Sequence, residues 1–458
     1  MSIHTQLRTA TTVGAAVSAI LLSSLAQADT TLSGWALMPA NTFAPGPSSG
    51  QFATSAFPAS NPLPLVDKQP VQGLSGVLHG PTANSFHVMT DNGFGAKTNS
   101  ADALLRMYAL TPNFKSYDGS AVVGAGTVDA VDYQSGAAQT SFNTSSFITL
   151  RDPDHKLGFQ IVAEQVNYPN GANNIPVDQR IRDARLLTGA DFDIEAVRQD
   201  KHGNLWFGDE FGPFLIKTDA SGKVLRSEVA LPGVQSPQNP HLVGAANLGR
   251  SSGFEGMAIN PAGDKLFTLL EGTVRGDVPK SLRINEFDIA SESYGELSYL
   301  YQLESAGTNI GDMSAINDHQ FLVIERNNTT ATTVGGAPFK KIFLADITGV
   351  ADGGFARKTE LVDLMNIADP HDLNGDGQTV FTFPYVTIED VLLLDANTLL
   401  VINDNNYPGG GGCGAFADNT EFLRLSLAQP VPLPLPTSVL LMMSSLAALV
   451  GLKRRKRA

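Results

Sequence analysis

The sequence predicts an all-β protein whose favoured form is a six-bladed β-propeller. Short runs rich in Val, Ile, Leu, Phe and Thr recur between clusters of Gly, Asn, Asp and Pro, and long amphipathic helical patterns are scarce. Short apolar runs bounded by turn-forming residues are typical of β-strands. The clearest runs cover residues 205–207, 266–270, 321–324 and 399–402. Residues 29–429 form the predicted body, which is long for one ordinary domain but suits a propeller or barrel.

The first 28 residues have the order of a secretory signal peptide. A positive charge at Arg8 precedes an apolar run over residues 13–25, which ends in Ala26-Gln27-Ala28. A basic start, an apolar stretch and a small-x-small site predict cleavage by signal peptidase before Asp29. We therefore expect the protein to be exported.

Residues 430–458 have the pattern of a sorting tail. The sequence PVPLPLP at 430–436 is followed by the uncharged residues 437–452 and then by a basic cluster at 453–457. The apolar stretch is slightly shorter than the roughly 20 residues of a comfortable membrane-spanning helix, and its basic end would stay cytoplasmic.

This tail resembles the PEP-CTERM sorting signals of Gram-negative bacteria, in their VPLPA variety. The resemblance implies cleavage by an exosortase-type transpeptidase near the Pro motif. Inner-membrane anchorage would then be transient, and the mature protein would reach the cell surface or the medium. A permanent anchor is the alternative.

Without both ends, the body holds 25 Lys and Arg against 45 Asp and Glu, a formal net charge of −20. This balance argues against nucleic acid as a partner, because a nucleic-acid-binding surface is usually basic. It suits cation binding or plain solubility.

Five stretches of the body repeat one pattern, in which a short motif precedes a strand-like run by about a dozen residues. The pairs are 74–77 with 86–91, 194–197 with 205–210, 254–257 with 266–271, 313–316 with 321–326, and 388–391 with 399–404. Each pair resembles the inner strands of a propeller blade.

The spacing of the repeats predicts the number of blades. If Ser75, Glu195, Glu255, Ser314 and Glu389 are equivalent, the intervals are 120, 60, 59 and 75 residues. The first interval is twice the second, which indicates a degenerate blade hidden between Gly93 and Asp191 and hence six blades. Strands near residues 31–37 and 421–427 would complete one blade together and leave no open sheet edge. Seven blades, or a stack of separate β domains, are the alternatives.

A propeller directs equivalent positions of its blades toward one axial channel, so the repeated acids should converge. They are Glu195, Glu255 and Glu389 at the motif position and Asp91, Glu210, Glu271 and Asp404 at the end of the strand-like run, where Arg326 is the fifth member. Carboxylates about 4 Å apart repel by roughly 4 kcal/mol per pair at an effective dielectric constant near 20. The cluster therefore needs cations, the charge of Arg326 or raised pKa values. Its oxygen ligands suit Ca²⁺, or alternatively Mg²⁺, better than zinc.

The chain also resembles the phytase-like family described as "esterase-like activity of phytase". The matching stretches are 191–197, 208–214, 253–258, 324–327, 387–390 and 403–406. The resemblance implies a propeller fold and cleavage of phosphate esters or a related esterase activity.

Two classes of function follow from these patterns. The first is a metal-dependent hydrolase of phosphate esters, in which Glu195, Glu255, Glu389 and Asp404 hold the cation and Arg326 grips the phosphoryl oxygens. A calcium-dependent lactonase is a variant of it. The second is a non-catalytic surface propeller that binds polysaccharide or a matrix partner through Trp206, Phe211, Phe214 and Tyr407, although core packing also explains these aromatic residues.

Overall fold

The computed structural model describes residues 30–53, 63–169, 174–409 and 418–433. The predicted signal peptide and most of the predicted sorting tail lie outside these ranges. Within them the regular secondary structure is almost entirely β-strand, with one short α-helix and one 3₁₀ turn. No helix among the described residues is long and apolar enough to span a membrane.

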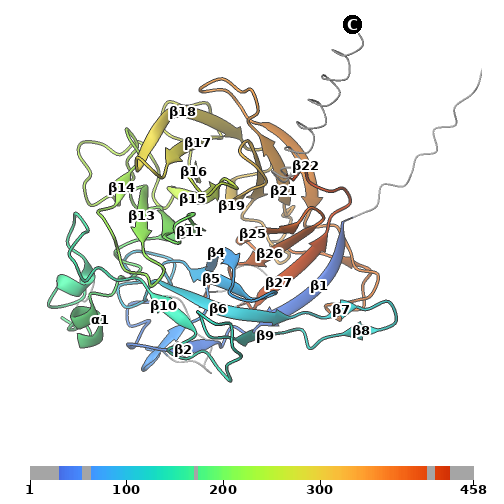
Figure 1. The fold of residues 1–458 in the computed structure, drawn as a ribbon, viewed down its shortest axis with the longest axis horizontal. Helices are drawn as coiled ribbons and strands as arrows, with labels where there is room; N and C mark the ends of the chain where they lie inside the picture. The colour runs from blue at the N-terminus through green and yellow to red at the C-terminus, as the bar shows by residue number, and fades with distance from the viewer. Residues whose placement is uncertain (1–29, 54–62, 170–173, 410–417, 434–458) are drawn as a thin grey trace, which may run out of the picture.

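The strands form antiparallel units arranged around one axis (Figure 1). Three units are separate four-stranded sheets made of consecutive strands. They are β11 (Ile194–Gln199), β12 (Leu205–Asp209), β13 (Phe214–Thr218) and β14 (Val229–Ala230); β15 (Phe254–Ile259), β16 (Lys265–Leu270), β17 (Ser281–Asp288) and β18 (Ser293–Gln302); and β19 (Asn309–Ala315), β20 (Gln320–Arg326), β21 (Lys340–Asp346) and β22 (Arg357–Asp363).

Two further units are joined at their outer edges. In the first unit, β4 pairs with β5 and β5 with β6, while β9 and β10 flank β6. In the last unit the order is β25, β26, β27 and β1. The bounds are β4 (Leu74–His79), β5 (Phe86–Thr90), β6 (Arg106–Asn113), β9 (Thr127–Ala130) and β10 (Phe147–Thr149), then β25 (Ile388–Asp395), β26 (Thr398–Asn403), β27 (Thr420–Ser426) and β1 (Thr31–Met38).

The predicted closure of the ring by the two ends of the body is confirmed. Strand β1 pairs antiparallel with β27, from Thr31 opposite Ser426 to Met38 opposite Thr420. The first strand of the body therefore becomes the outermost strand of the last unit. This pairing removes a free edge from β27, which would otherwise expose unpaired N–H and C=O groups.

The prediction of six blades is wrong for the described residues, which form five units. The inner strands β4, β11, β15, β19 and β25 contact one another in a closed ring, and β4 touches β11 directly. No room is left for a sixth unit between them. The long first interval arises because residues 93–191 supply the outer strands of the first unit and peripheral segments instead. These segments are β7 (Ser116–Tyr117), β8 (Val122–Val123), the 3₁₀ turn η1 (Val162–Glu164) and α1 (Gln179–Ala184).

The remaining strands are short and lie outside the ring pattern. Strand β2 (Phe43–Pro45) pairs with β3 (Lys68–Pro70), and β23 (Ile367–Ala368) pairs with β24 (Val380–Phe381) and with β1.

The core lies between neighbouring units, so the second strand of a unit is buried on both faces. In β12, Leu205 and Phe207 belong to the same core cluster as Met89 of the first unit, whereas Trp206 belongs to another cluster, with Met257 of the third. Successive side chains of a strand point to opposite faces, and here each face has an apolar partner. This is why the middle strands read as continuous apolar runs rather than alternating ones. Burying each large side chain contributes roughly 1.5–3 kcal/mol.

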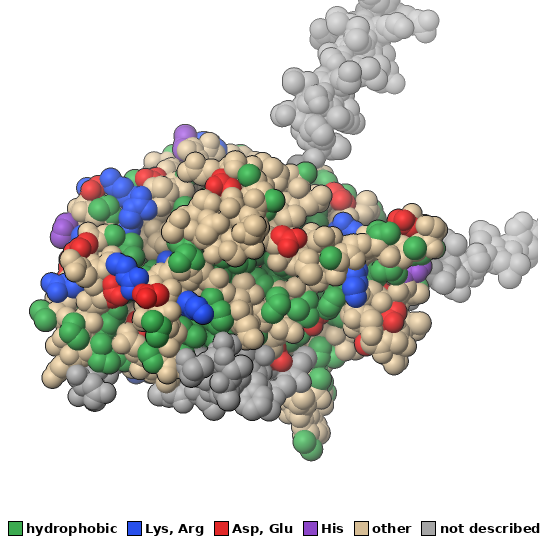
Figure 2. Space-filling view, turned by 90° about the horizontal axis from the view of Figure 1, so that it is seen from below, with side chains coloured by type: hydrophobic (Ala, Val, Ile, Leu, Met, Phe, Trp, Pro, Cys, Tyr) green, Lys and Arg blue, Asp and Glu red, His purple; other side chains and the backbone are tan. Residues whose placement is uncertain are grey.

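The surface at the outer edge of the first unit is not predominantly acidic. On this face, acidic and basic side chains are scattered among polar and apolar ones (Figure 2). Many of the carboxylates of the repeat are instead buried near the axis: Glu195, Glu210, Glu255, Glu389 and Asp404 are each 3–8% exposed.

Candidate functional site

An irregularity in each inner strand positions the axial carboxylates. The pairing register shifts between Ile194 and Ala196, so Glu195 has no residue opposite it in the neighbouring strand. The same holds for Glu255, Glu389 and Ser75 in their own units. Such bulges bend a strand and redirect a side chain, and they recur next to functional sites.

The fourth unit departs from the predicted equivalence. Its register shifts between Ile310 and Met313, so Gly311, rather than Ser314, occupies the position of Glu255. A Cβ at Gly311 would lie 1.9 Å from the backbone oxygen of Ile388, so no side chain fits there. Ser314 lies further along β19, in a cavity of about 320 Å³ that all five inner strands line.

The second set of predicted residues follows the ends of the second strands. Asp91, Glu210, Glu271 and Asp404 directly follow β5, β12, β16 and β26, and Arg326 is the last residue of β20. The charges of these residues and of the inner-strand glutamates raise one another's pKa, so the two sets lie close together. The structure thus gathers all eight predicted site residues at one end of the axis. We call the carboxylates there, together with the neighbouring Asp193, the acidic mouth.

Arg326 is the counterion of one half of the acidic mouth. Its Nη2 lies 3.0 Å from Oε1 of Glu389, 3.1 Å from Oε1 of Glu255 and 3.6 Å from Oε1 of Glu271. The guanidinium is buried, and its Nε has no hydrogen-bond partner among the described residues. Burial alone would lower the pKa of Arg326, but Glu389, Glu255 and Glu271 raise it. The side chain is therefore held as a cation among three glutamates.

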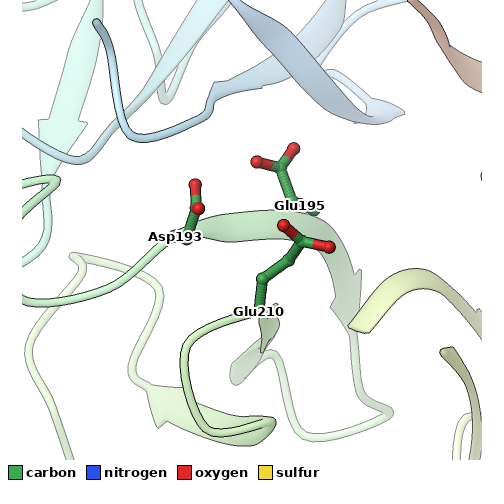
Figure 3. A group of neighbouring side chains, drawn as sticks. All are labelled: Asp193, Glu195 and Glu210. Atoms are coloured by element: carbon green, nitrogen blue, oxygen red, sulfur yellow. The ribbon is translucent and has the colours of Figure 1, made fainter. Parts of the chain in front are cut away.

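The other half of the acidic mouth contains three carboxylates that form no ion pair with any other described residue. Oxygen atoms of Asp193, Glu195 and Glu210 all lie within 4.8 Å of one another. Figure 3 shows Glu195 on β11, Asp193 just before this strand and Glu210 after β12, with their carboxyl groups around one space. We call these three residues the carboxylate triad.

Hydrogen bonds fix the backbone and side chains around the triad. Nδ2 of Asn92 donates to Oδ1 of Asp193 at 2.5 Å. Asp209 accepts from the backbone N–H of Asp193 at 2.9 Å and from that of Gly212 at 2.7 Å, so it ties together the two segments that carry the triad. On the opposite side, Oγ of Ser75 donates to Oε2 of Glu389 at 2.9 Å.

Burial and mutual repulsion make the charged form of the acidic mouth costly. Burial, followed by the charges of Asp193, Glu389 and other acids, raises the pKa of Glu195 well above its usual value. Burial and the charge of Asp404 raise the pKa of Glu389 to about 8, although Arg326 and Ser75 oppose this change. The pKa of Asp193 rises to about 6, mainly through burial. Protein groups alone would leave several of these carboxyls protonated near neutral pH.

The triad fits a hard divalent cation. Its donors are all carboxylate oxygens, which Ca²⁺ and Mg²⁺ prefer. Oε1 of Glu210 is buried and has no hydrogen-bond partner among the described residues. A buried acceptor without a partner carries its full desolvation penalty, about 1–3 kcal/mol or more for a charged group. A cation between the three carboxylates would remove that penalty.

Asp193 is the residue that sequence reasoning missed. It belongs to the stretch Asp191-Phe-Asp-Ile-Glu195, in which only Glu195 had been selected as a ligand. Residues two apart in an extended chain point to the same side, so the spacing of Asp193 and Glu195 was a usable signal. Asn309 was missed as well, and it donates to Oε1 of Glu271 at 2.6 Å.

Fold and site together define a β-propeller with a buried, carboxylate-lined mouth at one end of its axis. The chain belongs to the Phytase-like family, described as "Esterase-like activity of phytase", whose model matches residues 69–407. The resemblance drawn from the motifs is thereby confirmed. No curated protein matches the sequence.

Solved structures resemble the chain only distantly. A luciferin-regenerating enzyme is 10% identical, with 90% of this chain and 98% of that chain covered and a TM-score of 0.34. The PQQ-bound aldose sugar dehydrogenase from Streptomyces coelicolor is 12% identical, with 88% and 96% covered and a TM-score of 0.31. A GH43 β-1,3-galactosidase with galactodeoxynojirimycin is 10% identical, with 82% and 94% covered and a TM-score of 0.36. These values are too low to carry an argument about function.

Proposed function

We propose that the protein is an exported, divalent-cation-dependent hydrolase of phosphate esters. The carboxylate triad carries this proposal, because oxygen atoms of Asp193, Glu195 and Glu210 lie within 4.8 Å of one another and Oε1 of Glu210 has no hydrogen-bond partner among the described residues. Membership of a family described by an esterase-like activity of phytase supports the same class of reaction.

Each part of the acidic mouth has a distinct role in this proposal. The triad would hold Ca²⁺ or Mg²⁺, with Asp91 and Asp404 nearby to add negative charge. A cation bound there would lower the pKa of a water molecule and polarise a phosphoryl oxygen. Glu255 and Glu389 are held in place by Arg326, and they are the candidates to accept the proton of the attacking water. Arg326 lowers the pKa of both carboxyls, against the effect of burial, and so favours their charged form.

The geometry favours a hydrolase over a binding module. The aromatic residues that could have stacked on sugar rings are buried: Trp206 and Phe211 are 0% exposed, Phe214 is 1% and Tyr407 is 4%. They pack within the molecule and present no ring face to a polysaccharide.

The expected activity is hydrolysis of p-nitrophenyl phosphate or bis(p-nitrophenyl) phosphate by the mature protein. Exhaustive chelation should abolish it, and added Ca²⁺ should restore it, because the triad would lose and regain its cation. Unchanged turnover after chelation would contradict the cation-dependent mechanism. Turnover of carboxylic or lactone esters alone would shift the assignment to that ester class, and no turnover of any ester would favour the binding module.

We also propose that the sorting tail is removed after export by an exosortase-type enzyme. The order of Pro motif, apolar stretch and basic cluster in residues 430–458 supports this. Intact-mass measurement of the protein from its native host should give a chain that starts at Asp29 and lacks the basic cluster at 453–457. A mature protein that retains the cluster would favour a permanent anchor instead.

A further inference from the structure

Arg326 is poorly placed to receive a substrate's anionic oxygen. It is buried, and its Nη2 is shared among Glu255, Glu271 and Glu389. Moving the guanidinium toward a phosphoryl group would leave three buried carboxylates without their counterion. To accept an anionic substrate, the acidic mouth therefore needs a positively charged side chain other than Arg326 near the triad.

Lys97 is such a group. It lies in the loop after β5, is partly exposed, and its Nζ lies 4.8 Å from the centre of the Phe211 ring. Phe211 directly follows Glu210 of the triad. The hydrogen bond that Nζ makes, to the backbone oxygen of Gln238, is long at 3.4 Å. Among the described residues Lys97 forms no ion pair, so its ammonium retains donors for a ligand.

Asn92 fixes the loop that carries Lys97 relative to the triad. Its Oδ1 accepts from the backbone N–H of Gly95 at 2.9 Å and from Oγ of Ser100 at 3.1 Å. Its Nδ2 donates to Asp193 of the triad at 2.5 Å. One side chain thus joins the lysine loop to the proposed cation ligand.

Three aspartates influence the charge of Lys97, although it forms no ion pair among the described residues. Burial lowers the pKa of its ammonium, whereas the charges of Asp209, Asp191 and Asp193 act in the opposite direction. The oxygens of Asp209 and Asp191 are occupied by backbone N–H groups. The phenyl face of Phe211 supports the ammonium at a partly exposed position, a contact of about 0.5–1 kcal/mol.

We propose that Lys97 is the specificity-determining residue of the acidic mouth, and that it binds an anionic phosphoryl oxygen of the substrate. This inference rests on the proposed function, and it transfers to Lys97 the role that the sequence had suggested for Arg326. It also explains how a mouth with this many carboxylates can accept a phosphate ester. The cation of the triad and the ammonium of Lys97 would bind the same phosphoryl group from two sides.

The test measures binding of phenylphosphonate, an anion that the proposed reaction cannot cleave, to the calcium-loaded mature protein by calorimetry. Lys97→Met should weaken binding by about 10-fold or more, because a charge-assisted hydrogen bond is lost. Lys97→Arg should keep most of the affinity. Lys68→Met is the matched control, since Lys68 also lies over a phenylalanine ring, Phe43, at 5.6 Å, and it should bind like the wild type.

Two further readouts separate this inference from the proposed function. Lys97→Met should raise the KM for an aryl phosphate, because the substrate loses its contact with the ammonium. It should also bind Ca²⁺ several-fold more tightly, because a positive charge near Asp193 is removed. Wild-type binding of phenylphosphonate by Lys97→Met, or no binding by the wild type, would overturn the inference. If binding depends on Lys97 but no ester is hydrolysed, the inference stands and the proposed function fails.

Discussion

Replacing Arg326 with methionine should destabilise the cation-free protein by about 3–5 kcal/mol, because it leaves Glu255, Glu271 and Glu389 buried without their counterion. Methionine keeps much of the arginine stem's volume, so the loss of charge dominates. Thermal and urea unfolding in the presence of chelator measure the effect. Added Ca²⁺ should recover part of the loss, since a cation can partly neutralise the same group of carboxylates.

Lys358→Met is the matched control for this prediction. Nζ of Lys358 pairs with the fully buried Glu325 at 2.6 Å in the same unit as Arg326. Breaking this pair should also destabilise the protein, but Ca²⁺ should not recover the loss, because the acidic mouth is unchanged. If Arg326→Met unfolds like the wild type, or if Ca²⁺ rescues both variants equally, Arg326 is not the counterion of the mouth.

Glu195→Gln should change stability in opposite directions with and without a cation. In chelator the neutral amide relieves repulsion by Asp193, Glu255 and Glu389, and the variant should gain stability on the order of 1 kcal/mol. In Ca²⁺ it should lose stability, because a ligand that binds only the folded state stabilises that state by mass action. A 100-fold loss of affinity at saturating Ca²⁺ corresponds to about 2.7 kcal/mol. Thermal melts under both conditions reveal the reversal.

An exposed glutamate gives the reference for this reversal. Glu296 lies on the outer strand β18 and is exposed, so Glu296→Gln should shift stability by under about 0.5 kcal/mol in either condition. Parallel curves for Glu195→Gln and Glu296→Gln would mean that Glu195 belongs to no cation site.

The strand runs were predictable because the middle strands are buried on both faces. The runs at 205–207, 266–270, 321–324 and 399–402 all lie within second strands of units, where both sides of the sheet meet an apolar neighbour. The closing pair of β1 and β27 was predictable for a related reason. A ring without open edges needs the two ends of the body to pair.

The number of units was not predictable from spacing alone. An interval of 120 residues was read as two blades, yet residues 93–191 extend the first unit outward instead. The length of an interval gives only the number of residues between two inner strands. A long interval can contain an extra blade or an insertion into an existing one. Direct contact between β4 and β11 decides the question, and it depends on packing that no local pattern encodes.

The sequence predicted most residues of the site but not how they group in space. Repetition of acids at equivalent positions identified the acidic mouth, and Arg326 was singled out as its one basic member. The split into an Arg326 half and a triad that forms no ion pair with the other described residues depends on side-chain positions across different units. The choice of Ser314 failed because a bulge of two residues, Gly311 and Asp312, shifts the register of β19.

The central claim is that Asp193, Glu195 and Glu210 hold one divalent cation, and calcium titration of the chelator-stripped mature protein by calorimetry tests it most directly. We predict saturable binding by the wild type. Glu195→Gln should weaken it by at least the 10–100-fold that even an outer partner of a metal ligand typically contributes, and Glu296→Gln should bind like the wild type. No heat of binding to the wild type, or equal affinity of the wild type and Glu195→Gln, would contradict the account.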